Sequence, residues 1–257
     1  MTSTTVQMNR PQLPRRVAVI SDVHGNRHAL EAVLAAIDSS PFDEIWCLGD
    51  LVGYGAEPDA CVEAVEARVS AMLVGNHDLA VIGAFDISEF SHGAAEAVRW
   101  TRATMRPESI ATLQKYEPLN LDHAVALYHA SPRDPIWEYV LSARQASACM
   151  DAQARRVSLV GHSHIALSFQ RSDEQPASGA LRPEGTTLDI SEGQWILNPG
   201  AVGQPRDGDP RAAWLELDLE SWSATWHRAE YDIEGAAAAI RAAGLPATLA
   251  DRLAVGQ

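Results

Sequence analysis

The sequence has few cysteines, no long apolar run and fewer basic than acidic residues, and each shortage excludes a class of protein. Three cysteines in 257 residues, none in a Cys-x-x-Cys pair, fit a reduced cytoplasmic protein and exclude a disulfide framework. No stretch approaches the ~18 apolar residues of a membrane span, and the N-terminus lacks the apolar segment of a secretory signal. The net charge of −14 argues against strong binding to nucleic acid or to anionic membranes.

The composition is that of a globular domain. Hydrophobic residues make up 46% of the chain and charged residues 21%, which is ordinary for a protein with a large core. No linker, repeat or low-complexity block divides the chain. We therefore expect a flexible N-terminal tail over 1–15 and a single domain over 16–257.

The first part of this domain alternates strands and helices. "RRVAVISDVHGN" predicts a buried strand over 17–21 and a polar loop, and "RHALEAVLAAIDSS" has apolar residues at helical spacing. "DEIWCLGD" and "SAMLVGNHD" predict two more strands, each ending in a polar loop, with a helix between them. A strand–helix rhythm of this kind predicts the α/β class.

The rhythm changes after residue 82. Segment 83–118 holds two helical patterns without a strand, which would form either a lid over the strand ends or packing helices. Strand patterns return in "HAVALYHASP", "VSLVGHSHIALSFQR" and "QWILNPG", and 211–232 alternates as a β-hairpin. The polar segment 172–187 predicts a loop or hairpin tip. Helices over 233–243 and 246–253 close the chain. The second half is therefore richer in antiparallel strands.

Polar side chains recur directly after the predicted strands. In open α/β sheets, ligands bind outside the carboxyl ends of the strands, so these groups would converge there. His162 and His164 would point to the same side of an extended segment. The candidate groups are Asp22, His24, Asp50, Asn76, His77, Asp78, His129, His162 and His164.

Taken singly, several of these residues have simpler explanations. Asp22 would serve as a helix N-cap, and His129 would be a hydrogen-bonded core histidine. Their joint occurrence at five successive strand ends indicates a metal site instead. Carboxylate, amide and imidazole ligands suit Mn, Fe, Zn or Co, and the number of groups is too large for one ion and suits two.

Five sequence blocks together resemble the calcineurin-like metallophosphoesterases. They are "SDVHGN", "GDLVGYG", "GNHD", "LYHASP" and "GHSH", in the order and spacing of that superfamily. "NPGAVGQPRDGDPRAAW" resembles its small bacterial phosphodiesterase branch. The resemblance implies a four-layer α/β/β/α sandwich of two mixed β-sheets flanked by helices. It also implies a dinuclear metal site at the carboxyl ends of the strands.

The resemblance assigns the ligands to two divalent ions, with Mn expected first and Fe, Zn, Co or Ni as alternatives. Asp50 would bridge the ions, which would share a hydroxide that attacks phosphorus. Two sets of three residues would complete the coordination. Asp22, His24 and His164 would hold one ion, and Asn76, His129 and His162 the other.

The same resemblance gives expectations for catalysis and substrate binding. His77 would protonate the leaving group or stabilise the transition state, and Asp78 would orient His77. Many phosphoprotein phosphatases of the superfamily read "GDxVDRG", whereas Tyr54 stands here in the place of that arginine. Either another cation would replace that arginine, or the substrate would be a diester with less charge to hold. Replacement cations would come from the arginines that follow other motif blocks. These substrate-binding candidates are Arg27, Arg133 and Arg206, together with Tyr54 itself.

We therefore expect a cytoplasmic hydrolase that acts on phosphodiesters or phosphomonoesters of small substrates, nucleotides among them. A nuclease of the same fold is an alternative that the acidic surface opposes. A non-catalytic protein-binding scaffold is another, and it has no reason to retain His77. The sequence leaves open the preference for diester or monoester and whether the chain forms a homo-oligomer.

Overall fold

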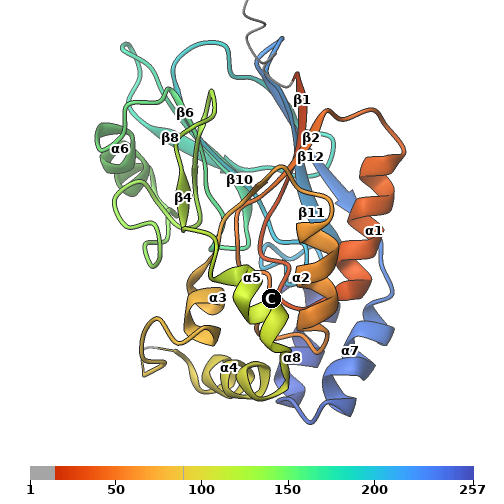
Figure 1. Ribbon diagram of the computed structural model, residues 1–257. Coiled ribbons are helices and arrows are strands. Elements are labelled where there is room, and N and C mark those ends of the chain that lie inside the picture. Colours follow the sequence, from red (N-terminus) through yellow and green to blue (C-terminus); the bar gives the residue numbers. More distant parts are fainter. Residues whose placement is uncertain (1–14, 89) are drawn as a thin grey trace, which may run out of the picture.

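The computed structural model describes residues 15–88 and 90–257, which fold around two β-sheets (Figure 1). Apart from Arg15, the tail expected over 1–15 lies outside the described residues. Within the described ranges, no helix is long and apolar enough to cross a lipid bilayer.

The first sheet, sheet A, has six strands in the described chain, in the order β3-β2-β1-β11-β12-β9. Strands β1, β2 and β3 are parallel, whereas β11 pairs antiparallel with β1 and begins the antiparallel half. The strands are β1 (Arg16–Ile20), β2 (Glu44–Cys47), β3 (Ala71–Met72), β9 (Thr187–Asp189), β11 (Ala212–Asp218) and β12 (Ser223–Ala229).

Sheet B is built in a similar way from a later part of the chain. Its order is β4-β5-β6-β10-β7-β8, with β5, β6 and β10 parallel and the remaining pairings antiparallel. The strands are β4 (Leu119–Asn120), β5 (Ala126–Tyr128), β6 (Val157–Leu159), β7 (Ala166–Arg171), β8 (Ser178–Leu181) and β10 (Gln194–Pro199).

Helices cover the outer faces of the sheets. Most pack on or beside sheet A, and α6 covers sheet B (Figure 1). They are α1 (Arg27–Asp38), α2 (Pro58–Glu66), α3 (Asn76–Val81), α4 (His92–Thr104), α5 (Pro107–Leu113), α6 (Ala143–Asp151), α7 (Ile233–Ala242), α8 (Ala247–Asp251) and the 3₁₀ helix η1 (Arg252–Val255).

Side-chain alternation along β1 explains the layering. Val17 and Val19 point into the core between the two sheets, whereas Ala18 and Ile20 point toward helices α1 and α2. A strand that is buried on both faces needs a continuous apolar run, which "VAVI" supplies. On sheet B, α6 packs Met150 and its neighbours against the outer face. The predicted four-layer α/β/β/α arrangement of two mixed sheets is therefore confirmed.

The structure differs from the prediction in two segments. The "GNHD" block does not remain a loop, because Asn76 opens the short helix α3. The polar segment 172–187 contains strand β8 and the start of β9. Residues of β8 are exposed, so no apolar alternation marked this edge strand in the sequence.

Candidate metal centre

Five of the predicted ligands have a left-handed backbone at the strand ends. The φ angles of Asp22, His24, Asp50, His162 and His164 lie between 51° and 62°. This region is costly for residues other than glycine, and such strain is characteristic of functional sites. The tight turns aim the side chains of all five toward the seam between the sheets, since Asp22, His24 and Asp50 follow strands of sheet A and the two histidines follow β6 of sheet B.

One group of buried ligands consists of Asp22, His24, Asp50 and His164. Each offers a ligand atom, and these atoms all lie within 4.8 Å of one another. The Nε2 of His164 is 3.4 Å from Asp22 Oδ1, and the Nε2 of His24 is 3.6 Å from Asp50 Oδ2. Two carboxylates and two imidazoles at these distances can surround one divalent cation.

The tautomers of His24 and His164 support this assignment. The Nδ1–H of His24 donates to Val52 O at 3.0 Å, and the Nδ1–H of His164 donates to Gln204 O at 2.7 Å. Both Nε2 atoms therefore carry lone pairs, and they face each other at 3.0 Å. Two facing lone pairs repel unless a cation or a proton lies between them. Backbone carbonyls that fix the Nδ1–H are typical of metal-binding histidines.

A second group contains Asp50, His129 and His162, whose ligand atoms also lie within 4.8 Å of one another. Asn76 joins this group, because its Oδ1 is 3.2 Å from His129 Nε2. The Nδ1–H of His129 donates to Leu48 O at 2.9 Å, which leaves Nε2 as the ligand nitrogen. The two groups thus bring together all seven predicted metal ligands.

Asp50 belongs to both groups. Its Oδ1 accepts a hydrogen bond from His77 N at 2.9 Å. Its Oδ2 is buried, has no hydrogen-bond partner among the described residues, and lies 3.6 Å from His24 Nε2 and 3.5 Å from His129 Nε2. A buried carboxylate oxygen without a donor is costly. The residues therefore fit a pair of cations that share the Asp50 carboxylate.

The site is electrostatically prepared for cations. In the cation-free fold, burial raises the pKa of Asp22 to about 7. Burial, followed by the charge of Asp78, raises the pKa of Asp50 well above its ordinary value. Burial lowers the pKa of His24 and His164, so both rings are neutral and able to coordinate a metal. A bound cation would displace the carboxyl protons.

Asp78 does not orient His77, contrary to the prediction. Its carboxylate accepts hydrogen bonds from three backbone amides, those of Leu51 at 3.2 Å, Val52 at 3.0 Å and Gly75 at 3.0 Å. In the described structure no hydrogen bond joins it to the His77 side chain. Asp78 instead fixes the loop that follows Asp50, because the third position of helix α3 aims it at those amides.

His77 is held by packing rather than by a hydrogen bond. Its Nδ1 is buried and lacks a partner among the described residues. The centroid of its ring is 4.4 Å from that of Tyr54 and 4.9 Å from those of His24 and Phe90. A Cβ at Gly53 would come within 2.5 Å of His77 Nδ1, so only glycine leaves room for the ring. His77 is thus placed beside the first ligand group without being a ligand.

A pocket of about 310 Å³ opens over these groups. Its floor contains Asn76, His77 and His162, so a molecule in the pocket would reach the predicted metal ligands. The remaining lining residues are Tyr54, Phe90, Ser91, Ala94, Trp137, Tyr139, Arg206 and Arg252. Because Phe90, Ser91 and Ala94 belong to the segment 83–118, that segment helps to wall the pocket, and its helix α4 also packs into the core.

Only part of the predicted substrate-binding set reaches the pocket. Arg206 does, with its Nη2 3.3 Å from the Tyr54 hydroxyl. Arg27 does not, because its Nε donates to Glu57 Oε1 at 2.7 Å on the surface. Arg133 is likewise held in an exposed ion pair with Glu138 and lines no part of the pocket. Arg27 and Arg133 therefore lie outside this pocket.

A family model described as the calcineurin-like phosphoesterase superfamily domain matches residues 16–220. The chain belongs to this superfamily. It is 36% identical to an uncharacterised protein of Methanocaldococcus jannaschii over 94% of this chain and 98% of the relative. It is also 28% identical to the symmetrical bis(5'-nucleosyl)-tetraphosphatase of Actinobacillus pleuropneumoniae, over 52% of each chain.

Solved structures resemble this metallophosphoesterase over most of its length. A metallophosphoesterase from Sphaerobacter thermophilus is 41% identical, with a TM-score of 0.86 over 95% of this chain and all of the other. A hypothetical protein from Pyrococcus horikoshii superposes with a TM-score of 0.76 over 94% of this chain and 98% of its own, at 18% identity, which shows a shared fold.

Outside the segment 83–118, sequence reasoning missed three pocket residues of this metallophosphoesterase. Arg252 comes from η1 near the end of the chain, and Trp137 and Tyr139 come from the loop before α6. None stands in a motif block. The one sequence signal was the aromatic pair in "DPIWEYV". The polar residues around this pair make the stretch resemble a loop.

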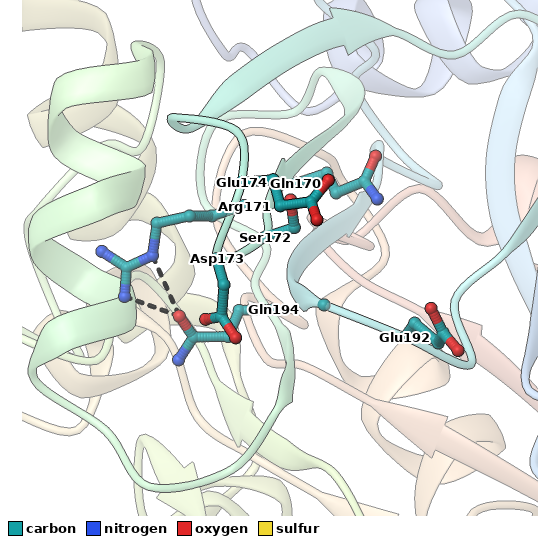
Figure 2. A pocket seen from close by; sticks show the side chains of 8 residues that line it. Gln170, Arg171, Ser172, Asp173, Glu174, Glu192 and Gln194 are labelled. Carbon is teal, nitrogen blue, oxygen red and sulfur yellow. Dashed lines mark hydrogen bonds between the residues drawn. The ribbon is translucent and has the colours of Figure 1, made fainter.

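A second hollow, of about 720 Å³, lies elsewhere on the surface (Figure 2). It shares no lining residue with the pocket over the metal ligands. Figure 2 shows Arg171 turned toward Gln194, and its Nε and Nη2 donate to Gln194 Oε1 at 2.9 and 2.6 Å. Arg171 also pairs with Asp151 at 2.8 Å. Its cation is therefore already partnered, and the hollow lacks a concentration of reactive groups.

Proposed function

We propose that this chain hydrolyses phosphate esters of small, nucleotide-type substrates with two divalent cations, Mn being the first candidate. The observation that carries the proposal is Asp50, whose Oδ2 lies between His24 and His129 without a hydrogen-bond donor. A carboxylate in this position serves no packing purpose and is suited to bridging two ions. Membership of the phosphoesterase superfamily points in the same direction.

The bound cations would supply an acidified water and neutralise phosphoryl charge. The chain itself would hold and orient the substrate. His77, on the pocket floor, would present an N–H to the leaving oxygen. Because burial, and then the charge of Arg206, lower the pKa of His77 well below its ordinary value, the ring is neutral at pH 7. It would therefore stabilise the transition state by hydrogen bonding more readily than it would transfer a full proton.

Three considerations favour a small, nucleotide-type substrate over a polynucleotide. The bis(5'-nucleosyl)-tetraphosphatase relative is named for a dinucleotide substrate, although the match spans about half of that protein. The pocket of about 310 Å³ has the size of a small-molecule site rather than of a long groove. The net charge of −14 also disfavours a polynucleotide substrate.

The scaffold alternative leaves the buried charges unexplained. A protein-binding domain gains nothing from two acidic and four imidazole groups buried at one seam, since each carries a desolvation cost. It also has no use for His77, which contacts the pocket and is not a ligand.

Metal analysis and hydrolysis assays test the proposal. The purified protein is assayed on bis-p-nitrophenyl phosphate and p-nitrophenyl phosphate, with and without added Mn²⁺. We expect about two cations per chain and Mn-stimulated hydrolysis; the preferred ester distinguishes diesterase from monoesterase.

Two variants separate binding from catalysis in this assay. Asp50→Asn should lose cations and activity together. His77→Ala should keep its cations and lose roughly 10²–10⁴-fold in rate. If both variants hydrolyse the esters like the wild type, the proposed function is wrong.

A further inference from the structure

Two chemically different walls enclose the pocket. One wall, here called the aromatic rim, consists of Phe90, Trp137 and Tyr139. Trp137 is 37% and Tyr139 42% exposed, although both are large rings. The ring centroids of Phe90 and Trp137 lie 5.6 Å apart. Exposed aromatic side chains grouped at the mouth of a pocket indicate a site for another flat ring.

The rim is fixed to the metal-ligand floor. Asp134 Oδ1 accepts hydrogen bonds from Ile136 N at 3.0 Å and from Trp137 N at 3.1 Å, which shapes the loop. The Trp137 carbonyl lies 3.3 Å from His162 Nε2. Tyr139 stacks on His162 with centroids 4.1 Å apart and planes 19° from parallel. A ring bound at the rim would thus lie at a defined position relative to the reacting phosphate.

Another part of the pocket lining is cationic. Arg206 and Arg252 share one acceptor, Gln204 Oε1, at 2.9 and 3.4 Å. Over the described residues neither arginine forms a salt bridge with an Asp or Glu side chain. The Nε of Arg252 donates to Gln257 O at 2.6 Å, and the Nε of Arg206 is buried without a partner. Two arginines without acidic side-chain partners are unexpected in a chain with a net charge of −14. They form a ready site for an anion with several oxygens.

We propose that the substrate is a nucleotide whose base stacks on the aromatic rim and whose second phosphate group, beyond the one attacked, binds Arg206 and Arg252. This rests on the function proposed above. Every nucleobase offers a flat π-face for stacking. The cations would neutralise the phosphoryl group under attack, which leaves the arginine charges for a further phosphate. Trp137 and Arg252 are then specificity-determining residues.

Calorimetric titration of the full-length, Mn-loaded protein tests both parts of the proposal. The probes are ribose 5-phosphate, AMP, which adds the base, and ADP, which adds a phosphate. Phosphate release is followed in the same samples, so that turnover is not mistaken for binding. We expect AMP to bind about tenfold more tightly than ribose 5-phosphate. We expect a further severalfold gain for ADP.

Substitutions test which part of the pocket lining produces each gain in affinity. Trp137→Ala should abolish the advantage of AMP over ribose 5-phosphate without weakening ribose 5-phosphate, and Trp137→Phe should retain most of it. Arg252→Ala should abolish the advantage of ADP over AMP. Leu141→Ala, on the same loop as the rim, and Arg27→Ala, in a surface ion pair, are matched controls that should bind all three probes like the wild type.

Three results would overturn the inference. Equal binding of AMP and ribose 5-phosphate by the wild type removes the stacking site, and equal binding of ADP and AMP removes the second phosphate site. A uniform loss for all probes in Trp137→Ala would show a structural role only. Mn-dependent hydrolysis of bis-p-nitrophenyl phosphate without any base preference leaves the proposed function intact. Base-dependent binding without hydrolysis of any ester would support the stacking site and contradict the proposed function.

Discussion

The metal ligands beneath the pocket, here called the floor, and the aromatic rim were specified by the sequence in different ways. The floor ligands stand directly after strands β1, β2, β5 and β6 or at the start of α3, inside short sequence blocks. The rim and the second arginine come from a loop, from the segment before α4 and from η1. Short sequence blocks at the strand ends thus specify the cation ligands. The walls that would select a substrate depend instead on how distant segments pack together.

The largest expected effect lies in the floor. His164→Gly and His162→Gly each remove one ligand from a different group while glycine accepts the left-handed backbone. Each variant should lower the cation content from about two to about one per chain and reduce activity by roughly 10²–10³-fold. Plasma mass spectrometry and ester hydrolysis measure the two quantities. Full cation content in both variants would contradict the assignment of the groups.

A smaller effect is expected in the wall. Arg206→Ala should raise KM about 10–100-fold, because charged hydrogen bonds to a phosphate are lost, while cation content stays unchanged. Arg133→Ala, which removes an ion pair with Glu138 outside the pocket, should leave kcat and KM within about twofold of the wild type. Steady-state kinetics on ADP, which carries a second phosphate group, provide the comparison. Similar losses in both variants would mean that the structure sorts the arginines incorrectly.

The floor should also make cation binding depend on pH. Since burial raises the pKa of Asp22 from 3.8 to about 7, the folded carboxyl holds its proton where the unfolded one has lost it. This group therefore stabilises the cation-free fold below about pH 4, and the contribution is lost as the pH rises through about 7. A cation needs the ionised form, so its affinity should fall about tenfold per pH unit below 7.

Scanning calorimetry measures this linkage. The increase in Tm on adding Mn²⁺ should be larger at pH 8 than at pH 6. Asp22→Asn, which removes one of the two buried carboxyls that must lose a proton, is the matched variant and should reduce this difference. An equal or larger increase at pH 6 in the wild type would contradict the expected sign.

The smallest expected effect comes from substituting Asp78, the neighbour of His77. Asp78→Asn places an amide NH₂ against backbone N–H donors, and should lower the free energy of unfolding by about 1–3 kcal/mol. Urea unfolding measures this change. The shape of the pH–rate profile should not change, because Asp78 does not touch His77. A shifted profile with unaltered stability would restore the orienting role that the sequence suggested.

The sequence alone predicted the floor because its geometry is short-range. A ligand placed two or three residues after a buried strand must lie at the sheet edge, as Asp22 and Asp50 do. Strand alternation also predicted the mixed α/β architecture, and the family resemblance supplied the four layers. Exposed edge strands such as β8 carried no apolar pattern and were missed.

The walls could not be predicted for an equally physical reason. Arg27, Arg133 and Arg206 all follow motif blocks, and position along the chain did not distinguish the one that enters the pocket. The three arginines differ in their partners, because Glu57 forms an ion pair with Arg27 and Glu138 forms one with Arg133. Arg252 lies 46 positions beyond Arg206 in the sequence numbering, and only the packing of η1 beside Gln204 brings the two together.

The position of the ligand groups has a mechanical consequence for the whole molecule. Each group draws side chains from both sheets, with Asp50 on sheet A common to the two. Bound cations would therefore cross-link the two sheets at one edge. No disulfide does this, because the three cysteines of the chain are all unpaired. Chelation should thus loosen the two halves of the sandwich against each other, so that the same ions serve as reagents and as cross-links.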